Sequence, residues 1–240
     1  MVEIFYLTVL SIVPGFVWLA LFLHEDWRHP EPRSFVTLAF FGGMVATAFV
    51  FFIQNALHSA FFHGDITELL FAQALSWKQF NFLATFAAVE EIAKFLVVWV
   101  LVRPWKAFDE PLDAMIYMII AGLGFAVVEN IAYTSALVKG TIVAANPAQI
   151  ILLRAIGSTL LHAITSAVIG YHWALAMLRT STRRFSISTG IAFAVVLHVV
   201  FNYLIITAGE RVMLPFLFLA VVLFFILIDF QKVKHKEHLI

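Results

Sequence analysis

The chain contains no cysteine, and charged residues make up only 12% of its 240 positions, whereas 62% are hydrophobic. The absence of cysteine excludes disulfides, thiolate metal sites and a cysteine nucleophile. Soluble domains carry about 25% charged residues, so a low charge content of this kind excludes an ordinary soluble protein. The formal net charge is zero, which leaves no basic field that would attract nucleic acid. The composition therefore predicts an integral membrane protein in contact with the lipid bilayer.

Long apolar runs divide the chain. A helix needs about 20 apolar residues to cross about 30 Å of hydrocarbon. Seven runs reach that length: residues 4–23, 36–61, 80–102, 113–138, 151–178, 187–208 and 213–230. The first run lacks a basic segment before it and a small-residue cleavage site after it, so we interpret it as a retained span. The sequence predicts an all-α polytopic membrane protein, with about seven transmembrane helices in a single domain over residues 1–240.

The distribution of lysine and arginine between these runs predicts the orientation of the chain. Cytoplasmic loops carry an excess of positive charge. With the N-terminus outside, ten basic residues are cytoplasmic and four lie in outer segments. The ten are Arg28, Arg33, Arg103, Lys106, Arg179, Arg183, Arg184, Lys232, Lys234 and Lys236, and the four are Lys78, Lys139, Arg154 and Arg211. We therefore expect the N-terminus outside and the C-terminus in the cytoplasm.

One run differs from the others because Glu90, Glu91 and Lys94 lie near its middle. Each ionisable side chain at that depth costs roughly 2.5 kcal/mol or more, so such groups are usually paired or functional. Lys94 is four residues from Glu90 and three from Glu91, which places either carboxylate beside the ammonium on a helix. The two glutamates point about 100° apart. One of them can therefore face a cavity while the lysine holds the other.

Three further runs carry polar groups at helical spacing. These groups form the patterns Phe125-x-x-x-Glu129-Asn130, His162-x-x-x-Ser166 and His198-x-x-x-Asn202. Counted from the outer end of each run, Glu90, Glu129 and both histidines lie about ten residues in, or about 15 Å deep. We therefore expect four helices to bring these groups to one plane.

The predicted cluster suits the hydrolysis of an amide, in either of two ways. Its three glutamates and one lysine sum to a formal charge of minus two, which a protonated carboxyl, an imidazolium or a divalent cation must offset. Glu129, His162 and His198 have the donor types of a hydrolytic zinc centre, with Glu90 as general base toward water. Without a metal, the same groups can activate water directly while Asn202 stabilises the oxyanion. Both mechanisms fit the sequence, with Glu91 paired to Lys94 and Asn130 supporting Glu129.

The motif series resembles the PrsW family of intramembrane proteases. The resemblance rests on Glu90-Glu91-x-x-Lys94, Gly122-x-Gly124-Phe125-x-x-x-Glu129-Asn130, Arg154 followed by His162, and His198-x-x-x-Asn202. It implies a prokaryotic cell-membrane metalloprotease in which Glu90 and Glu91 are the most critical acids. It also implies a membrane-anchored protein substrate, typically an anti-sigma factor cut at its extracytoplasmic site. The related type II CAAX endopeptidases have histidine where this chain has Glu129, which disfavours a prenylated substrate.

Two other functions are compatible with buried carboxylates and histidines. A proton- or cation-coupled transporter would show helices broken by glycine or proline in two matching halves. The runs that carry the cluster contain no proline, and the chain shows no internal repeat. A noncatalytic scaffold would keep a polar network for assembly only. The presence of all the glutamates and both histidines favours the protease over the scaffold.

Overall fold

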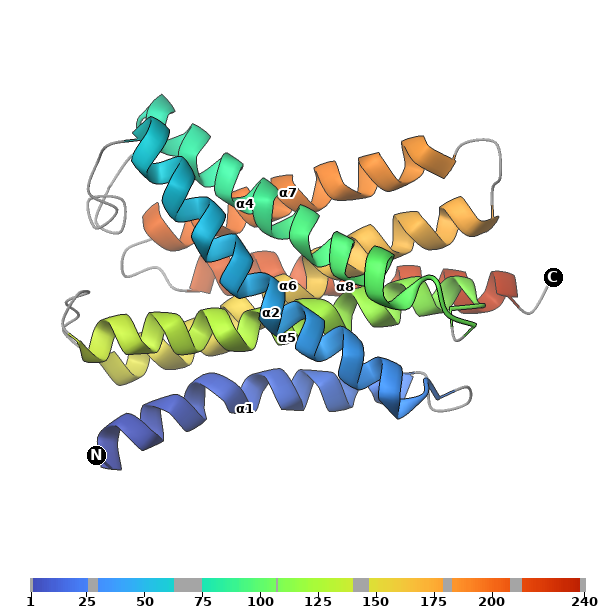
Figure 1. The fold of residues 1–240 in the computed structure, drawn as a ribbon, viewed down its shortest axis with the longest axis horizontal. Helices are drawn as coiled ribbons and strands as arrows, with labels where there is room; N and C mark the ends of the chain where they lie inside the picture. The colour runs from blue at the N-terminus through green and yellow to red at the C-terminus, as the bar shows by residue number, and fades with distance from the viewer. Residues whose placement is uncertain are drawn as a thin grey trace.

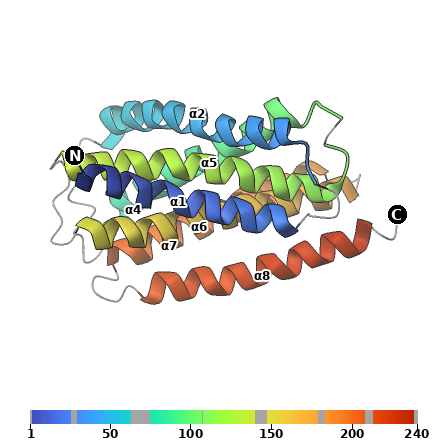
Figure 2. The same ribbon diagram turned by 90° about the horizontal axis from the view of Figure 1, so that it is seen from below.

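The fold is a bundle of long helices. The computed structural model describes residues 2–25, 30–62, 75–106, 108–139, 147–178, 183–207 and 213–237, and these residues contain no strand. They form seven α-helices: α1 (Val2–Glu25), α2 (Arg33–Leu57), α4 (Trp77–Val97), α5 (Pro111–Val138), α6 (Pro147–Leu178), α7 (Arg183–Thr207) and α8 (Met213–Glu237). Successive helices run in opposite directions, so the start of α1 and the end of α8 lie at opposite ends of the bundle (Figures 1 and 2). The predicted all-α membrane fold is confirmed.

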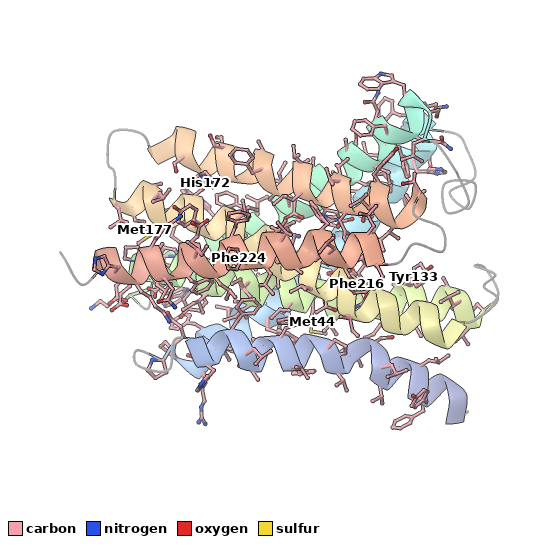
Figure 3. The ribbon with its side chains drawn as sticks, turned by 180° about the vertical axis from the view of Figure 1, so that it is seen from behind. Met44, Tyr133, His172, Met177, Phe216 and Phe224 are labelled. Atoms are coloured by element: carbon pink, nitrogen blue, oxygen red, sulfur yellow. The ribbon has the colours of Figure 1, made fainter. Side chains whose placement is uncertain are left out.

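Six of these helices are long and apolar enough to cross a membrane, namely all except α4. Their outward surfaces carry large apolar side chains, among them Phe49 on α2 and Phe224 on α8. Figure 3 shows Phe224 from the back of the bundle. Helix α4 continues as a π-helical segment, Val98–Val102, to a similar total length. It differs from the other six because Glu90, Glu91 and Lys94 lie close together in it, and all three are buried inside the bundle. Its passage through the membrane stays a prediction.

Helix α5 lies at the centre and packs against α6, α2 and α1. It begins at a capping box in which Glu110 and Asp113 satisfy each other's backbone N–H groups, with Pro111 in the first turn. The helix is apolar on every side, and nearly all of its residues from Leu112 to Val127 are fully buried. It is therefore the central helix on which the others pack.

Glycines allow the backbones of α5 and its neighbours to approach closely. A Cβ atom at Gly43 of α2 would overlap the carbonyl oxygen of Ala121, and one at Gly124 would overlap the carbonyl oxygen of Phe40. Small residues of this kind are typical of helix contacts in membranes. Thr47 of α2 adds a hydrogen bond, 3.2 Å long, to the carbonyl oxygen of residue 125. These contacts fix α2 on α5.

The same kind of contact joins α5 to α6. A Cβ atom at Gly122 would overlap the hydroxyl of Ser166, and one at Gly170 would meet the backbone of Met115. Glycines on both helices therefore allow the close packing of α5 on α6.

Candidate active site

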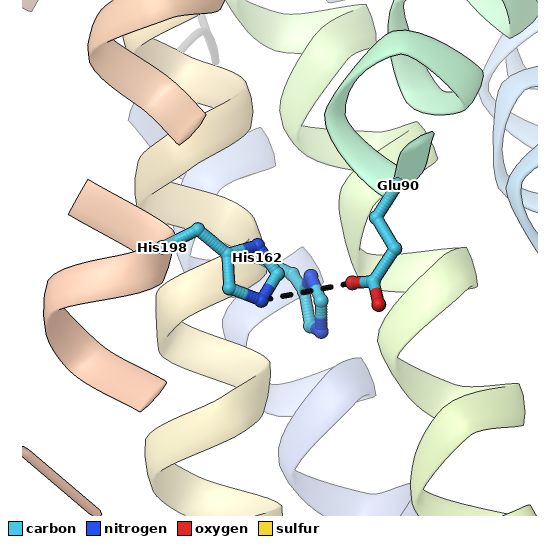
Figure 4. A group of neighbouring side chains, drawn as sticks. All are labelled: Glu90, His162 and His198. Carbon is cyan, nitrogen blue, oxygen red and sulfur yellow. Dashed lines mark ion pairs between the residues drawn. The ribbon is translucent and has the colours of Figure 1, made fainter. Parts of the chain in front are cut away.

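Four helices bring the predicted ionisable groups together in the middle of the bundle. Helix α4 supplies Glu90, Glu91 and Lys94, α5 supplies Glu129, and α6 and α7 supply one histidine each. The rings of His162 and His198 are 5.3 Å apart, edge to face. Figure 4 shows both imidazoles turned toward Glu90. The convergence that the motif spacing predicts is present.

Glu91 is the buried anchor of this cluster. Its Oε1 atom lies 2.7 Å from Nζ of Lys94 and 2.7 Å from Nδ1 of His198. A carboxylate only accepts hydrogen bonds, so Nδ1 of His198 carries the proton and Nε2 presents a lone pair. That Nε2 atom lies 3.6 Å from Oε2 of Glu90. The predicted pair of Glu91 and Lys94 is present, and Glu91 also sets the tautomer of His198.

His162 is held from both sides. Its Nε2 atom lies 2.7 Å from Oε2 of Glu129, and its Nδ1 atom lies 3.1 Å from Nζ of Lys94. An ammonium only donates, so Nδ1 accepts from Lys94 and Nε2–H donates to Glu129. Ser158 donates a further hydrogen bond, 3.1 Å long, to the same oxygen of Glu129. Both ring nitrogens of His162 are therefore engaged.

Glu90 has one held oxygen and one free oxygen. Nε2 of Gln54 on α2 donates a 2.8 Å hydrogen bond to Oε1 of Glu90, whereas the buried Oε2 atom has no hydrogen-bond partner among the described residues. Gln54 was not among the site residues predicted from the sequence. A glutamine inside a 25-residue apolar helix is itself a sign of a partner, because an amide in hydrocarbon needs one. Gln54 also continues the buried stripe of Gly43, Thr47 and Val50.

The cluster fits a divalent cation. Ligand atoms of Glu90, His162 and His198 all lie within 4.8 Å of one another. Two imidazoles and a carboxylate are a donor set that zinc prefers, and the orphaned Oε2 of Glu90 faces Nε2 of His198. Glu129 is the carboxylate ligand predicted from the sequence, whereas the structure groups Glu90 with the two histidines. Both ring nitrogens of His162 already have partners, so ligation through Nδ1 requires Lys94 to turn toward Glu91 or Thr165, and ligation through Nε2 requires Glu129 to turn away.

The remaining predicted residues lie around this cluster. The Phe125 ring packs 5.2 Å from the ring of His162 and 5.5 Å from the ammonium of Lys94, a cation–π contact. Asn130 donates a 2.9 Å hydrogen bond to Thr159, which ties α5 to α6. Asn202 lies one turn beyond His198 on α7 and is partly buried. The side chain of Arg154 lies outside those that the structure describes.

The site is most open at the carboxylates of Glu90 and Glu129. The side chains of Glu129 and Glu90 are 17% and 11% exposed, whereas those of the two histidines, Glu91 and Lys94 are 3% exposed or less. A substrate would therefore meet the cluster at the edge formed by Glu90 and Glu129.

A helical membrane bundle with a carboxylate–imidazole cluster between its helices is the architecture of an intramembrane hydrolase. The chain belongs to the PrsW family of intramembrane metalloproteases, whose model, described as "PrsW family intramembrane metalloprotease", matches residues 31–228. The matched range contains every residue of the cluster, Gln54 included. No solved structure matches the chain.

Curated relatives agree with this assignment. The chain is 28% identical over 207 residues to "Protease PrsW" of Geobacillus kaustophilus, a match that covers 86% of this chain and 82% of the relative. It is 24% identical over 217 residues to "Protease PrsW" of Oceanobacillus iheyensis, covering 89% and 91%. A third match, to "Protease PrsW" of Bacillus subtilis, is 30% identical over 51% of each chain. The bacterial relatives and the membrane-spanning helices indicate a prokaryotic membrane protein.

Proposed function

We propose that this protease hydrolyses a peptide bond of membrane-anchored proteins at the cluster of Glu90, His162 and His198. The observation that carries the proposal is the buried Oε2 atom of Glu90, which has no hydrogen-bond partner among the described residues and lies 3.6 Å from Nε2 of His198. A water molecule beside this pair of acceptor atoms could donate a hydrogen to each of them, which prepares it to lose a proton. We further propose an anti-sigma factor as the substrate and the plasma membrane as the location.

In the reaction, Glu90 accepts a proton from water while the water oxygen attacks the scissile carbonyl carbon. Asn202 donates to the developing oxyanion. The carbon–nitrogen bond then breaks, and the proton held by Glu90 passes to the leaving amine. Glu91 keeps the Nε2 lone pair of His198 turned toward the water, because its carboxylate holds the proton on Nδ1.

A divalent cation, which we propose to be zinc, would be held by Glu90, His162 and His198. When bound, it supplies Lewis-acid polarisation of the scissile carbonyl. Glu129, which lies beside His162 at the open edge of the cluster, is then the carboxylate left to accept the proton from water.

Loss of Glu90 or His198 tests the assignment. The wild type is first co-expressed with candidate single-span membrane proteins, and immunoblotting of the fragments identifies one that it cleaves. We expect Glu90→Gln and His198→Ala to lower cleavage by roughly 10²–10⁴-fold, the usual contribution of a general base. His172→Ala is the matched control, because His172 lies on α6 outside the cluster and is half-buried. Wild-type cleavage by folded, membrane-inserted Glu90→Gln would remove this cluster from the reaction.

Metal analysis of the purified protein decides between the two mechanisms. We expect about one zinc per chain by elemental analysis, with less metal in His198→Ala and unchanged metal in His172→Ala, because only His198 belongs to the ligand group. A chelator should abolish activity, and added zinc should restore it. Full activity in metal-free protein would leave direct activation of water by Glu90 as the mechanism.

A further inference from the structure

Two grooves follow the line along which α2 and α4 lie side by side, which we call the α2–α4 seam (Figure 1). The first, the apolar groove, has a volume of about 540 Å³. Its lining includes Phe41, Val45, Phe49, Ala93, Leu96 and Leu101, and no residue in it is charged. The second, the mixed groove, has a volume of about 550 Å³ and lies between the end of α2 and the start of α4. It is lined by Leu57, Phe61, Trp77, Lys78, Asn81 and Thr85.

The seam is closed between the two grooves at the hydrogen bond from Gln54 to Glu90. On α2 the apolar groove ends at Ile53 and the mixed groove begins at Leu57. On α4 the mixed groove ends at Thr85 and the apolar groove begins at Ala93. Gln54 and Glu90 therefore lie in the gap between the two grooves, Gln54 on α2 and Glu90 on α4. A segment that lies along the whole seam must pass over the carboxylate to which we assign the chemistry.

We propose that the α2–α4 seam docks the transmembrane segment of the substrate, with the apolar part of that segment in the apolar groove and its membrane-border part in the mixed groove. The scissile bond then lies opposite Glu90, whose Oε1 atom is held by Gln54 from the α2 side. This inference rests on the proposed function, because it takes Glu90 as the reacting group.

The chemistry of the two grooves favours a protein segment as the occupant. The apolar groove extends along α2 from Leu38 to Ile53, about 22 Å at 1.5 Å per residue, which is most of the hydrocarbon thickness. Its wall includes the exposed side chains of Phe41, Val45 and Phe49, an apolar surface on which a second helix can pack. The mixed groove adds an ammonium, an amide and a hydroxyl, which can pair with the polar backbone of a segment that is leaving its helix.

The position of Glu90 between the two grooves favours a protein substrate over a bound lipid as the occupant of the seam. A lipid chain would fill the apolar groove, but it offers no peptide bond to the carboxylate that interrupts the seam. Lys78 further predicts a preference for substrates with an acidic residue beside the membrane border.

Bulk placed in the apolar groove tests the proposal. Val45→Trp adds volume at a lining residue that is 57% exposed, and Val221→Trp adds the same volume on α8, where Val221 is 50% exposed. We expect Val45→Trp to lower kcat/KM for the single-span protein identified above by about tenfold or more, through KM, because a packed contact worth about 1.4 kcal/mol is lost. A short detergent-soluble peptide that contains the cleaved bond should be hydrolysed at the wild-type kcat. Val221→Trp should match the wild type on both.

A crosslinking measurement guards against misfolding of the tryptophan variant. A photo-reactive phenylalanine analogue at Phe49 in the His198→Ala background should capture the uncleaved single-span protein, whereas the same analogue at Phe224 on α8 should not. Crosslinks to lipid alone at Phe49, equal capture at Phe224, or wild-type cleavage by Val45→Trp would each overturn the docking site. If Glu90→Gln is inactive while Val45→Trp is fully active, only the docking site fails. If Glu90→Gln is active, both the proposed function and the docking site fail.

Discussion

Gln54 shows how one side chain prepares a buried carboxylate for chemistry. Its amide donates to Oε1 of Glu90 and leaves Oε2 as the only oxygen free to act on water. A carboxylate with two free oxygens would have no fixed direction in the site. Gln54 is therefore a positioning residue, which acts on the substrate through Glu90.

Replacement of Gln54 measures that contribution. We expect Gln54→Leu to lower kcat by roughly 10- to 100-fold with little change in KM for a short peptide, since a hydrogen bond to a charged group is worth about 1.5–3 kcal/mol. Asn55→Leu removes a neighbouring amide on the exposed side of the same helix and should leave kcat unchanged. An equal fall in both variants would mean that the effect comes from α2 as a whole.

The residues of the cluster were predictable because each lies in an apolar run where a charge is conspicuous. Helical spacing also gave the pair of Glu91 and Lys94. Spacing alone did not assign the carboxylate nearest the two imidazoles, because that choice depends on side-chain rotation. The proximity of Glu90 to both histidines, and of Glu129 to His162 and Ser158, follows from coordinates only. Gln54 was missed because no charge marks it and its partner lies 36 residues further along the chain.

At the scale of helices, the contact between α2 and α5 determines where Gln54 lies. Gly43 allows the backbone of α2 to meet that of α5 at Ala121, and Gln54 lies three turns further along the same buried stripe. A larger residue at this contact would push α2 outward and withdraw the amide from Glu90.

Substitution of Gly43 tests this link. We expect Gly43→Val to destabilise the protein by about 1–3 kcal/mol, as overpacking does, and to lower kcat because the hydrogen bond from Gln54 to Glu90 is lost. Gly157→Ala is the control, because its added Cβ would meet only ring atoms, the nearest 3.3 Å away on Phe201. Thermal unfolding in detergent and kcat for the short peptide report the two effects. A stable but inactive Gly43→Val would locate the fault in the site rather than in packing.

The helix boundaries were predictable from hydrophobicity to within a few residues at most ends. The run 113–138 corresponds to α5 at Pro111–Val138, and the run 213–230 falls within α8 at Met213–Glu237. The apolar run underestimates α8 because its last turns carry Lys232 and Lys234, whose long side chains allow a helix to extend past the hydrocarbon. Two π-helical segments, His58–Phe62 after α2 and Val98–Val102 after α4, were not predictable from the spacing of apolar residues.

At the scale of the whole molecule, the opposite positions of the two chain ends fit an odd number of crossings. The excess of basic residues in one set of loops predicts the N-terminus outside. Reporter fusions after Glu237 should therefore be active as cytoplasmic reporters, and fusions after Lys139 should report from the outer side. A cytoplasmic signal after Lys139 would reverse the orientation and place the mixed groove on the inner border.

The pairing of Glu91 with Lys94 inside one helix has a consequence for how the protein is made. During synthesis α4 emerges before α6 and α7, so a span at α4, as the sequence predicts, brings its acids into the membrane before His162 and His198 exist. Glu91 has its counter-ion, Lys94, three residues away on the same helix. The amide that pairs with Glu90 belongs to Gln54 on α2, which is synthesised earlier. The order of the chain thus lets α4 be inserted with partners for both glutamates already present. His162 and His198 then pack against carboxylates that the earlier helices have positioned.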